Sequence, residues 1–235
     1  MTKAKSLGGE YRTRGEYHKH LDKKWKAYPI YILKMEYIRK YLDKVSKSLK
    51  IADLGCGEGV LVEEYKKKGY DIIGVDYNYS SEYVVRGDIT KLKFKNDSFD
   101  LVLALDVVEH LNFDEQKKAI SEIQRILKNG GKALISIPNL AHFASRVAFL
   151  LLGKLIRTST IERHKGDRPI NEYINLIKEN NFKIISRKGI FPTFPIISAA
   201  TYFAPGKVVW MHRIYNKLIG IPNICIINIL EIRKK

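Results

Sequence analysis

The chain has 235 residues, 45% of them hydrophobic and 29% charged, which predicts a folded protein with one sizeable core and excludes a disordered chain. Its 42 Lys and Arg against 25 Asp and Glu give a net charge of +17, which favours polyanionic partners or is simply a lysine-rich surface. Only Cys56 and Cys225 are cysteines, so we expect no disulfide framework. The first ten residues lack an apolar signal segment, so we expect a cytoplasmic protein.

The amino-terminal part is basic and aromatic up to Pro29, where a helical pattern begins. One face of this predicted helix carries Ile30, Leu33, Tyr37, Ile38, Tyr41 and Leu42. We expect residues 1–45 to form a helical extension that either closes as a lid over the site or packs on the edge of a sheet.

Strand and helix patterns alternate from residue 46 onward. Strands are predicted at 49–54, 71–75, 83–86, 99–104 and 132–137, and helices at 60–68 and 113–128. Asn112 and Glu115 form a capping box for the second helix, and the Asn129-Gly130-Gly131 turn is expected to stop it. Strands alternating with helices of this length indicate crossover units and a parallel sheet.

The pattern changes after residue 138. Helices are predicted at 140–152 and 170–180, and strands at 182–187 and 224–232. The apolar stretch 190–206 is interrupted by three prolines, which argues against a membrane-spanning helix. We therefore predict an α/β fold: a Rossmann-like, seven-stranded, mostly parallel sheet with helices on both faces. One domain would cover 46–235, with acceptor-side insertions at 139–168, after the fifth strand, and at 189–222.

A glycine-rich turn joins the first predicted strand to the first helix after it. Gly55, Gly57 and Gly59 allow a close approach of backbone to a ligand, and Asp76 follows about 20 residues later, where an acid meets ribose hydroxyls. The spacing is one residue shorter than in dinucleotide sites. Asp53 and a further acid within the turn would repel a pyrophosphate but attract the sulfonium and ammonium of S-adenosylmethionine. S-adenosylmethionine is therefore favoured over NAD as the cofactor.

Five blocks in order resemble the class I S-adenosylmethionine-dependent methyltransferases, in the branch that includes the ubiquinone and menaquinone biosynthesis methyltransferases. The resemblance covers about residues 49–138. The blocks are the turn 53–59, Gly74-Val75-Asp76, Gly87-Asp88-Ile89, the run from Phe99-Asp100-Leu101-Val102 through Glu109-His110-Leu111, and Leu127-Lys128-Asn129-Gly130-Gly131. The family usually has proline at the position of Asn129, a change that a turn tolerates.

The resemblance implies a methyltransferase that uses S-adenosyl-L-methionine and releases S-adenosyl-L-homocysteine. It places Asp53, Gly55 and Gly57 at the methionine portion, Asp76 at the ribose, and Asp88 at the adenine amine. The full set of implied cofactor residues is Asp53, Gly55, Cys56, Gly57, Asp76, Tyr77, Asp88, Ile89, Leu105 and Asp106.

Catalysis of methyl transfer from a sulfonium consists largely of positioning, with a base needed only where the acceptor is a hydroxyl. Glu109, His110 and His164 are the candidate catalytic residues, the first two soon after the fourth predicted strand and the third in a polar loop. The alternative is that Glu109 and His110 only pack and cap the next helix. Two adjacent ligands without a further cluster are a weak metal signal, so no metal site is predicted.

Two observations bear on the identity of the methyl acceptor: the motifs that the sequence lacks, and the apolar segments in the two insertions. The sequence has no Asn/Asp-Pro-Pro block for base amines and no Pro-Cys or Thr-Cys nucleophile for pyrimidine carbons. The apolar segments 143–152 and 190–206, with basic flanks, favour O- or C-methylation of an apolar small molecule, quinone-like or lipid-linked, and peripheral contact with an anionic membrane surface. The alternatives are an RNA (rRNA or tRNA) methyltransferase and a non-catalytic S-adenosylmethionine-binding partner protein.

Overall fold

The computed structural model describes residues 5–6 and 16–235, so residues 1–4 and 7–15 of the expected extension 1–45 lie outside the described residues. The core of the molecule is a seven-stranded sheet in the order β5-β3-β2-β6-β7-β9-β8. The strands are β2 (Lys50–Leu54), β3 (Asp71–Asp76), β5 (Val84–Arg86), β6 (Phe99–Leu105), β7 (Leu127–Pro138), β8 (Phe182–Pro192) and β9 (Cys225–Lys234). Strands β5, β3, β2, β6 and β7 run parallel, and β9 is antiparallel to both β7 and β8. The predicted seven-stranded, mostly parallel sheet is confirmed.

A second, two-stranded sheet pairs β1 (Lys5–Ser6) with β4 (Tyr79–Ser80) in antiparallel fashion. The described helices are α2 (Tyr28–Leu42), α3 (Val60–Lys67), α4 (Phe113–Ile126), α5 (Phe143–Leu152), α6 (Ile170–Glu179), α7 (Pro195–Phe203) and α8 (Val209–Ile219), with the short 3-10 turns η1 (Val108–His110) and η2 (Pro205–Lys207).

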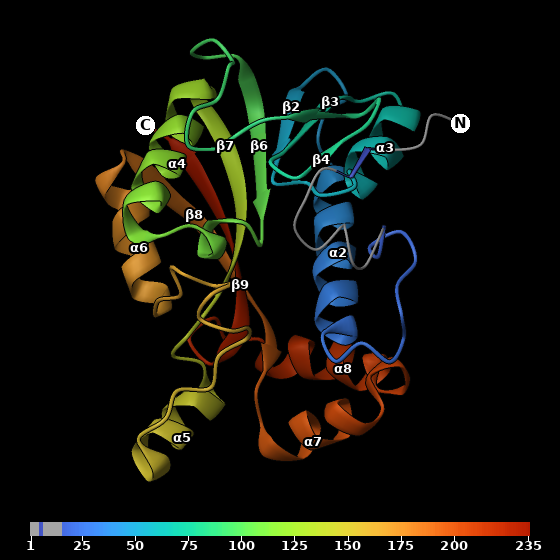
Figure 1. Cartoon of the computed structure of the whole chain (residues 1–235), viewed down its shortest axis with the longest axis vertical. Helices are drawn as coiled ribbons and strands as arrows, with labels where there is room; N and C mark the ends of the chain where they lie inside the picture. Colours follow the sequence, from blue (N-terminus) through green and yellow to red (C-terminus); the bar gives the residue numbers. More distant parts are fainter. Residues whose placement is uncertain (1–4, 7–15) are drawn as a thin grey trace.

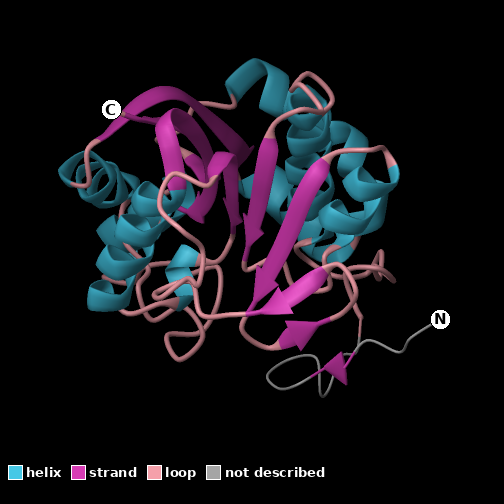
Figure 2. Ribbon diagram, turned by 90° about the horizontal axis from the view of Figure 1, so that it is seen from above, coloured by secondary structure: helices cyan, strands magenta, loops and turns pink. Residues whose placement is uncertain are grey.

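Helices cover both faces of the main sheet, as the view from above shows (Figure 2). On one face, Ile123 of α4 and Ile177 of α6 are fully buried in a cluster with the strands. On the other face, Ile38 of α2 and Tyr65 of α3 bury equally deeply. This two-sided cover explains why the central strands are apolar along their whole length rather than alternating.

Helix α4 shows how local sequence sets an element's limits. The side-chain oxygen of Asn112 accepts from the backbone N–H of Glu115 at 2.9 Å, and Glu115 accepts from the N–H of Asn112 at 2.9 Å, so the predicted capping box is confirmed. The predicted end is wrong by two residues. The helix ends at Ile126 because Leu127 already pairs with Phe99 as the start of β7, and Gly130, with φ of +74°, turns within that strand.

The stretch 190–206 is not a single insertion. Its first residues extend β8 to Pro192, so the expected insertion 189–222 begins inside the sheet. A proline is tolerated there because β8 is an edge strand and Pro192 is its last residue. The rest of the expected insertion 189–222 contains α7, η2 and α8. Helix α8, which the sequence pattern did not predict, packs on α2 and β8. None of the described helices combines the length and the hydropathy needed to span a membrane.

The parallel strands end at one edge of the sheet, and this edge faces α5 and α7. In Figure 1 the arrow of β6 points toward the end of the molecule where α5, α7 and α8 lie. In folds of this type, ligands bind beyond the carboxyl ends of the strands. The candidate site therefore lies between the sheet and these three helices.

Candidate functional site

The glycine turn between β2 and α3 forms the floor of the site. Gly55, Gly57 and Gly59 have φ values of +68°, +56° and +71°, a region that side chains other than glycine rarely adopt. The N–H of Gly55 donates to the Val75 carbonyl at 2.7 Å, which ties the turn to β3. A Cβ on Gly55 would lie 2.4 Å from the Cγ2 of Val107, so the loop after β6 packs directly against the turn. Glycine at this position is a steric requirement.

Two buried carboxyl groups flank the turn. Asp76 accepts from the N–H of Gly57 at 2.9 Å and from the N–H of Asn78 at 2.8 Å, and burial is the main cause that raises its pKa. Asp53 is 3% exposed, and burial raises its pKa to about 7, with Asp76 adding to the shift and Lys34 opposing it. The site therefore has a strong preference for a cationic ligand, because a positive charge would stabilise both carboxylates.

A third acid is held by an ion pair from the amino-terminal helix. Lys34 of α2 is buried, and its ammonium group donates to Asp106, just past β6, while the hydroxyl of Ser136 on β7 donates to the other carboxylate oxygen. Burial alone would raise the pKa of Asp106, but the Lys34 charge and these hydrogen bonds hold it below its usual value. Asp106 also has a φ of +53°, a conformation that turns the chain back toward the glycine turn.

The segment before α2 reaches the same turn. The Nδ1 of His18 lies 2.5 Å from a carboxylate oxygen of Glu58, and the His18 N–H donates to the other oxygen at 3.0 Å. The His18 ring also stacks on Tyr31, with centroids 5.4 Å apart. Glu58 is buried by these contacts, so the described part of the amino-terminal segment covers one side of the glycine turn.

The other expected cofactor residues take different positions. One carboxylate oxygen of Asp88 accepts from both the N–H and the hydroxyl of Thr90, at 2.9 and 2.7 Å. Ile89 is buried in the core, and Tyr77 is exposed. The remaining two are half-buried: Leu105 ends β6, and Cys56 lies in the turn, where burial raises its pKa well above the usual value.

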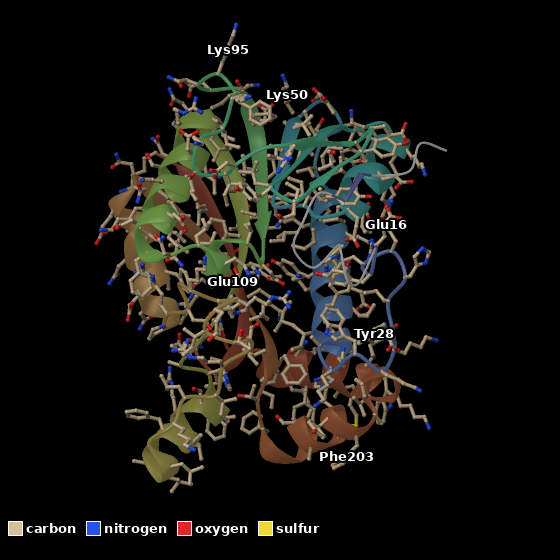
Figure 3. The ribbon with its side chains drawn as sticks, viewed as in Figure 1. Glu16, Tyr28, Lys50, Lys95, Glu109 and Phe203 are labelled. Carbon is tan, nitrogen blue, oxygen red and sulfur yellow. The ribbon has the colours of Figure 1, made fainter. Side chains whose placement is uncertain are left out.

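The three expected catalytic residues are brought together. Glu109, His110 and His164 each offer a ligand atom within 4.8 Å of the others, although His164 comes from the loop between α5 and α6. Burial, reinforced by Asp106, raises the pKa of Glu109 well above its usual value. Burial and the neighbouring His164 lower the pKa of His110, so this ring favours its neutral form. Figure 3 shows Glu109 just beyond the carboxyl edge of the sheet.

A further buried histidine lies at the start of α5. His142 caps α5, with its Nδ1 2.9 Å from the Thr193 hydroxyl and its Nε2 3.1 Å from the Ile156 carbonyl. Both ring nitrogens are occupied, so His142 is a structural residue that fixes the start of α5.

Sequence reasoning missed Lys34 and the pair of His18 with Glu58. A signal for Lys34 existed, because it lies four residues from both Ile30 and Ile38 and therefore on the buried face of α2. A lysine on such a face needs a buried partner. No local pattern indicates that Glu58 would pair with a residue so far before it in the chain.

Comparison with known proteins identifies the domain that carries this site. Residues 52–135 match the family model described as "Methyltransferase domain". An uncharacterised protein of Methanocaldococcus jannaschii is 33% identical over 107 residues, which cover 43% of this chain and 45% of that protein. A protein of Pelagibacter ubique named ubiquinone biosynthesis O-methyltransferase is 27% identical over 166 residues, 63% of this chain and 67% of that one. The chain thus spans between about half and two thirds of these curated relatives.

The fold is shared with solved structures over nearly the whole chain. A protein of Pyrococcus horikoshii OT3 superposes with a TM-score of 0.62 at 17% identity, covering 97% of this chain and all of that one. A SAM-dependent methyltransferase of Archaeoglobus fulgidus gives a TM-score of 0.54 at 17% identity, covering 96% of this chain and 97% of its own. At these identities the similarity establishes the architecture alone.

Proposed function

We propose that this chain is an S-adenosylmethionine-dependent methyltransferase that transfers the methyl group to a small, apolar acceptor, quinone-like or lipid-linked, at an oxygen or a carbon atom. The observation that carries the acceptor class is the uncharged surface beyond the carboxyl edge of the sheet. The cofactor class follows from the family and agrees with the charge and shape of the glycine turn.

The residues of the turn fit the cofactor. S-adenosylmethionine supplies a methyl group on a cationic sulfonium, so its methionine end requires negative charge nearby. Asp53 supplies that charge, and Gly55 and Gly57 leave the backbone bare for close approach. Asp76 stands at the end of β3, where its carboxylate can accept from ribose hydroxyls in place of its present backbone donors. Asp88 offers a carboxylate oxygen to the adenine amine.

In this proposal, the residues of the chain accelerate methyl transfer mainly by positioning the cofactor and the acceptor. Lys34 and Ser136 fix the Asp106 carboxylate at the end of β6, and Val107 closes against Gly55. These contacts hold the residues between the glycine turn and the cluster of Glu109, His110 and His164 in place before any ligand binds. A preorganised and partly dry site lowers the cost of aligning acceptor and methyl group in line.

The acceptor side is apolar to an unusual extent. Within α5 only Ser145 is buried, whereas Leu150 is 83% exposed and its neighbours are also open to solvent. Phe203, at the end of α7, is 84% exposed and lies at the same end of the molecule (Figure 3). We define the apolar end of the molecule by its exposed residues Phe149, Leu150, Leu151, Leu152, Tyr202, Phe203, Trp210, Ile214 and Leu218. Exposed apolar surface of this extent indicates an interaction site.

Basic side chains surround the apolar end. The Lys26 ammonium lies 3.7 Å from the centroid of the Tyr202 ring, and Arg146, Lys154, Lys207 and Lys217 belong to or adjoin α5, α7 and α8. Apolar residues flanked by cations are typical of segments that lie on an anionic membrane surface. We propose that the apolar end rests on such a surface, from which an apolar acceptor would enter. The name of the Pelagibacter relative agrees with this class of acceptor.

The test is transfer of labelled methyl groups from S-adenosylmethionine to separated lipid, small-metabolite and RNA fractions. We expect label in the lipid or apolar small-metabolite fraction. Label in the RNA fraction alone would favour a nucleic-acid methyltransferase and overturn the proposed acceptor. Binding of the cofactor by calorimetry with label in no fraction would favour a non-catalytic binding protein.

A further inference from the structure

Two arginine side chains from different elements bind the same residue, Asn223, in the loop between α8 and β9. Arg146 of α5 donates from its Nη2 to the Asn223 carbonyl at 3.2 Å and from its Nε to the Ala141 carbonyl at 2.6 Å. Arg187 of β8 donates from its Nη2 to the side-chain oxygen of Asn223 at 2.9 Å. Two guanidinium groups are therefore held at one exposed residue whose own side chain carries no charge.

Neither guanidinium group is neutralised by an acidic side chain within the described part of the chain. The acceptors that Arg146 and Arg187 use are carbonyl and amide oxygens. A guanidinium group has five N–H donors, so most donors of both residues remain for a further ligand. Two neighbouring positive charges repel each other unless an anion lies beside them. The pair therefore favours an anionic ligand.

Arg187 carries an independent sign that an anion belongs beside it. Its Nε is buried and has no hydrogen-bond partner among the described residues. Burial is the cause that lowers the pKa of Arg187, and no acidic group among the described residues acts against it. A buried N–H on a charged group is costly unless an acceptor satisfies it. The oxygens of a phosphate group match the fork of a guanidinium group and would satisfy this donor.

The loop that carries Asn223 is fixed by both strands beside it. Asn139, just past β7, donates from its side-chain nitrogen to the carbonyls of Asn223 and Cys225, each at 3.2 Å. A Cβ on Gly189 of β8 would lie 2.9 Å from the Gly220 carbonyl, so the loop packs directly on that strand. The two arginines therefore meet at a residue whose position is set by the fold.

The arginine pair lies at the base of the exposed apolar surface of α5. Arg146 and Leu150 are four residues apart in this helix, so their side chains lie on the same side of it. Leu150 is 83% exposed, and Arg146 is exposed as well. An anionic group bound at Arg146 and Arg187 could therefore carry an apolar chain that lies along α5. This arrangement fits an amphiphile with an anionic head.

We propose that Arg146, Arg187 and Asn223 bind the phosphate or diphosphate head of the methyl acceptor, whose apolar chain lies along α5. The inference rests on the proposed function, because it names the head group of a lipid-linked acceptor. A phosphate monoester carries about −1.5 to −2 charges at pH 7, which the two guanidinium groups balance. The site binds the acceptor at a distance from the reacting atoms and takes no part in the bond changes.

The test is binding of dodecyl phosphate to the full-length protein by calorimetry, below the concentration at which this amphiphile forms micelles. We expect it to bind at least tenfold more tightly than dodecyl maltoside, which has the same chain and a neutral head, and than inorganic phosphate, which has no chain. Arg146→Gln and Arg187→Gln should each weaken binding of dodecyl phosphate about 10- to 100-fold, because each removes hydrogen bonds to a charged group.

Lys188→Gln is the matched control, because it removes the same charge from the neighbouring position of the same strand. Arg187 pairs with Leu230 and Lys188 with Ile229, so the two side chains point to opposite faces of the sheet. The control should bind dodecyl phosphate as the parent does. Thermal melts and the affinity for S-adenosylmethionine, both expected to be unchanged, show that the variants are folded.

Two outcomes would overturn the site itself. The first is dodecyl phosphate bound no more tightly than dodecyl maltoside, and the second is an equal loss in the control and in both arginine variants. Inorganic phosphate bound as tightly as dodecyl phosphate would refute the role of the apolar chain. If dodecyl phosphate does not bind but the arginine variants lose binding to phosphatidylglycerol vesicles, the arginines contact bilayer head groups and the acceptor head is refuted.

The outcomes also separate this inference from the proposed function. Binding of dodecyl phosphate that is lost in both arginine variants supports the site even where no lipid fraction is methylated, in which case only the proposed function fails. A labelled lipid fraction whose labelling is unchanged in Arg146→Gln and Arg187→Gln would leave the proposed function standing and refute the head-group site.

Discussion

Replacing Asp53 with asparagine should separate stability from cofactor binding. Burial raises the pKa of Asp53 from its ordinary value of 3.8 to about 7. Below pH 4 the carboxyl group is protonated in both the folded and the unfolded chain, so it imposes no cost. Between pH 4 and pH 7 the unfolded chain ionises while the folded chain keeps its proton, so the free energy of unfolding falls as the pH rises. Above pH 7 both are ionised and the cost is constant.

The size of the effect follows from the shift. Three pKa units at 1.36 kcal/mol each correspond to about 4 kcal/mol lost between pH 4 and pH 8, as an order of magnitude. Asp53→Asn cannot ionise, so at pH 8 its free energy of unfolding should exceed that of the parent by a few kcal/mol, while the two should agree near pH 4. Urea unfolding at pH 4, 6 and 8 measures this difference, with the exposed Asp71→Asn as the matched control.

The same substitution should weaken the binding of S-adenosylmethionine. Loss of a charge-assisted contact of about 1.5–3 kcal/mol predicts a 10- to 100-fold weaker affinity for S-adenosylmethionine at pH 8. In the parent protein the affinity should rise from pH 6 to pH 8, because the cation binds the ionised form of Asp53, and this dependence should be smaller in Asp53→Asn. Parallel pH profiles of stability in the two proteins, or an affinity that the substitution leaves unchanged, would refute the reasoning.

Two further predictions address the turn and the apolar end. Gly55→Ala places a Cβ 2.4 Å from Val107 at a positive φ, so we expect a loss of about 1–3 kcal/mol in stability and of cofactor binding by calorimetry. Gly69→Ala, with a φ of +86° and open space, should keep binding, and equal loss in both variants would contradict the steric argument. Leu150→Glu, and likewise Phe203→Glu, should reduce sedimentation with anionic liposomes about tenfold or more, since each removes an apolar contact of roughly 1.5–3 kcal/mol. Salt-insensitive or absent sedimentation of the parent protein would reject the membrane surface.

The sequence by itself determined the features that depend on neighbours in the chain. The glycine turn, the capping box at Asn112 and the alternation of strand and helix patterns are all readable within a few residues, because backbone conformation and burial periodicity are local properties. All seven strands of the main sheet were predicted for the same reason, although β7 begins five residues earlier and β8 ends five residues later than predicted. The end of α4 was missed because pairing of Leu127 with Phe99, a long-range contact, overrode the local stop signal.

Only the tertiary structure decided which side chains meet at the site. The pairing of Lys34 with Asp106, the contact of His18 with Glu58 and the approach of His164 to Glu109 all join residues from separate elements. No periodicity encodes them, since they arise where the carboxyl ends of strands, the amino-terminal helix and the loop before α6 converge. The sequence alone therefore indicated the cofactor, whereas the approach of His164 to Glu109 and the pairing of Lys34 with Asp106 were decided only by the tertiary fold.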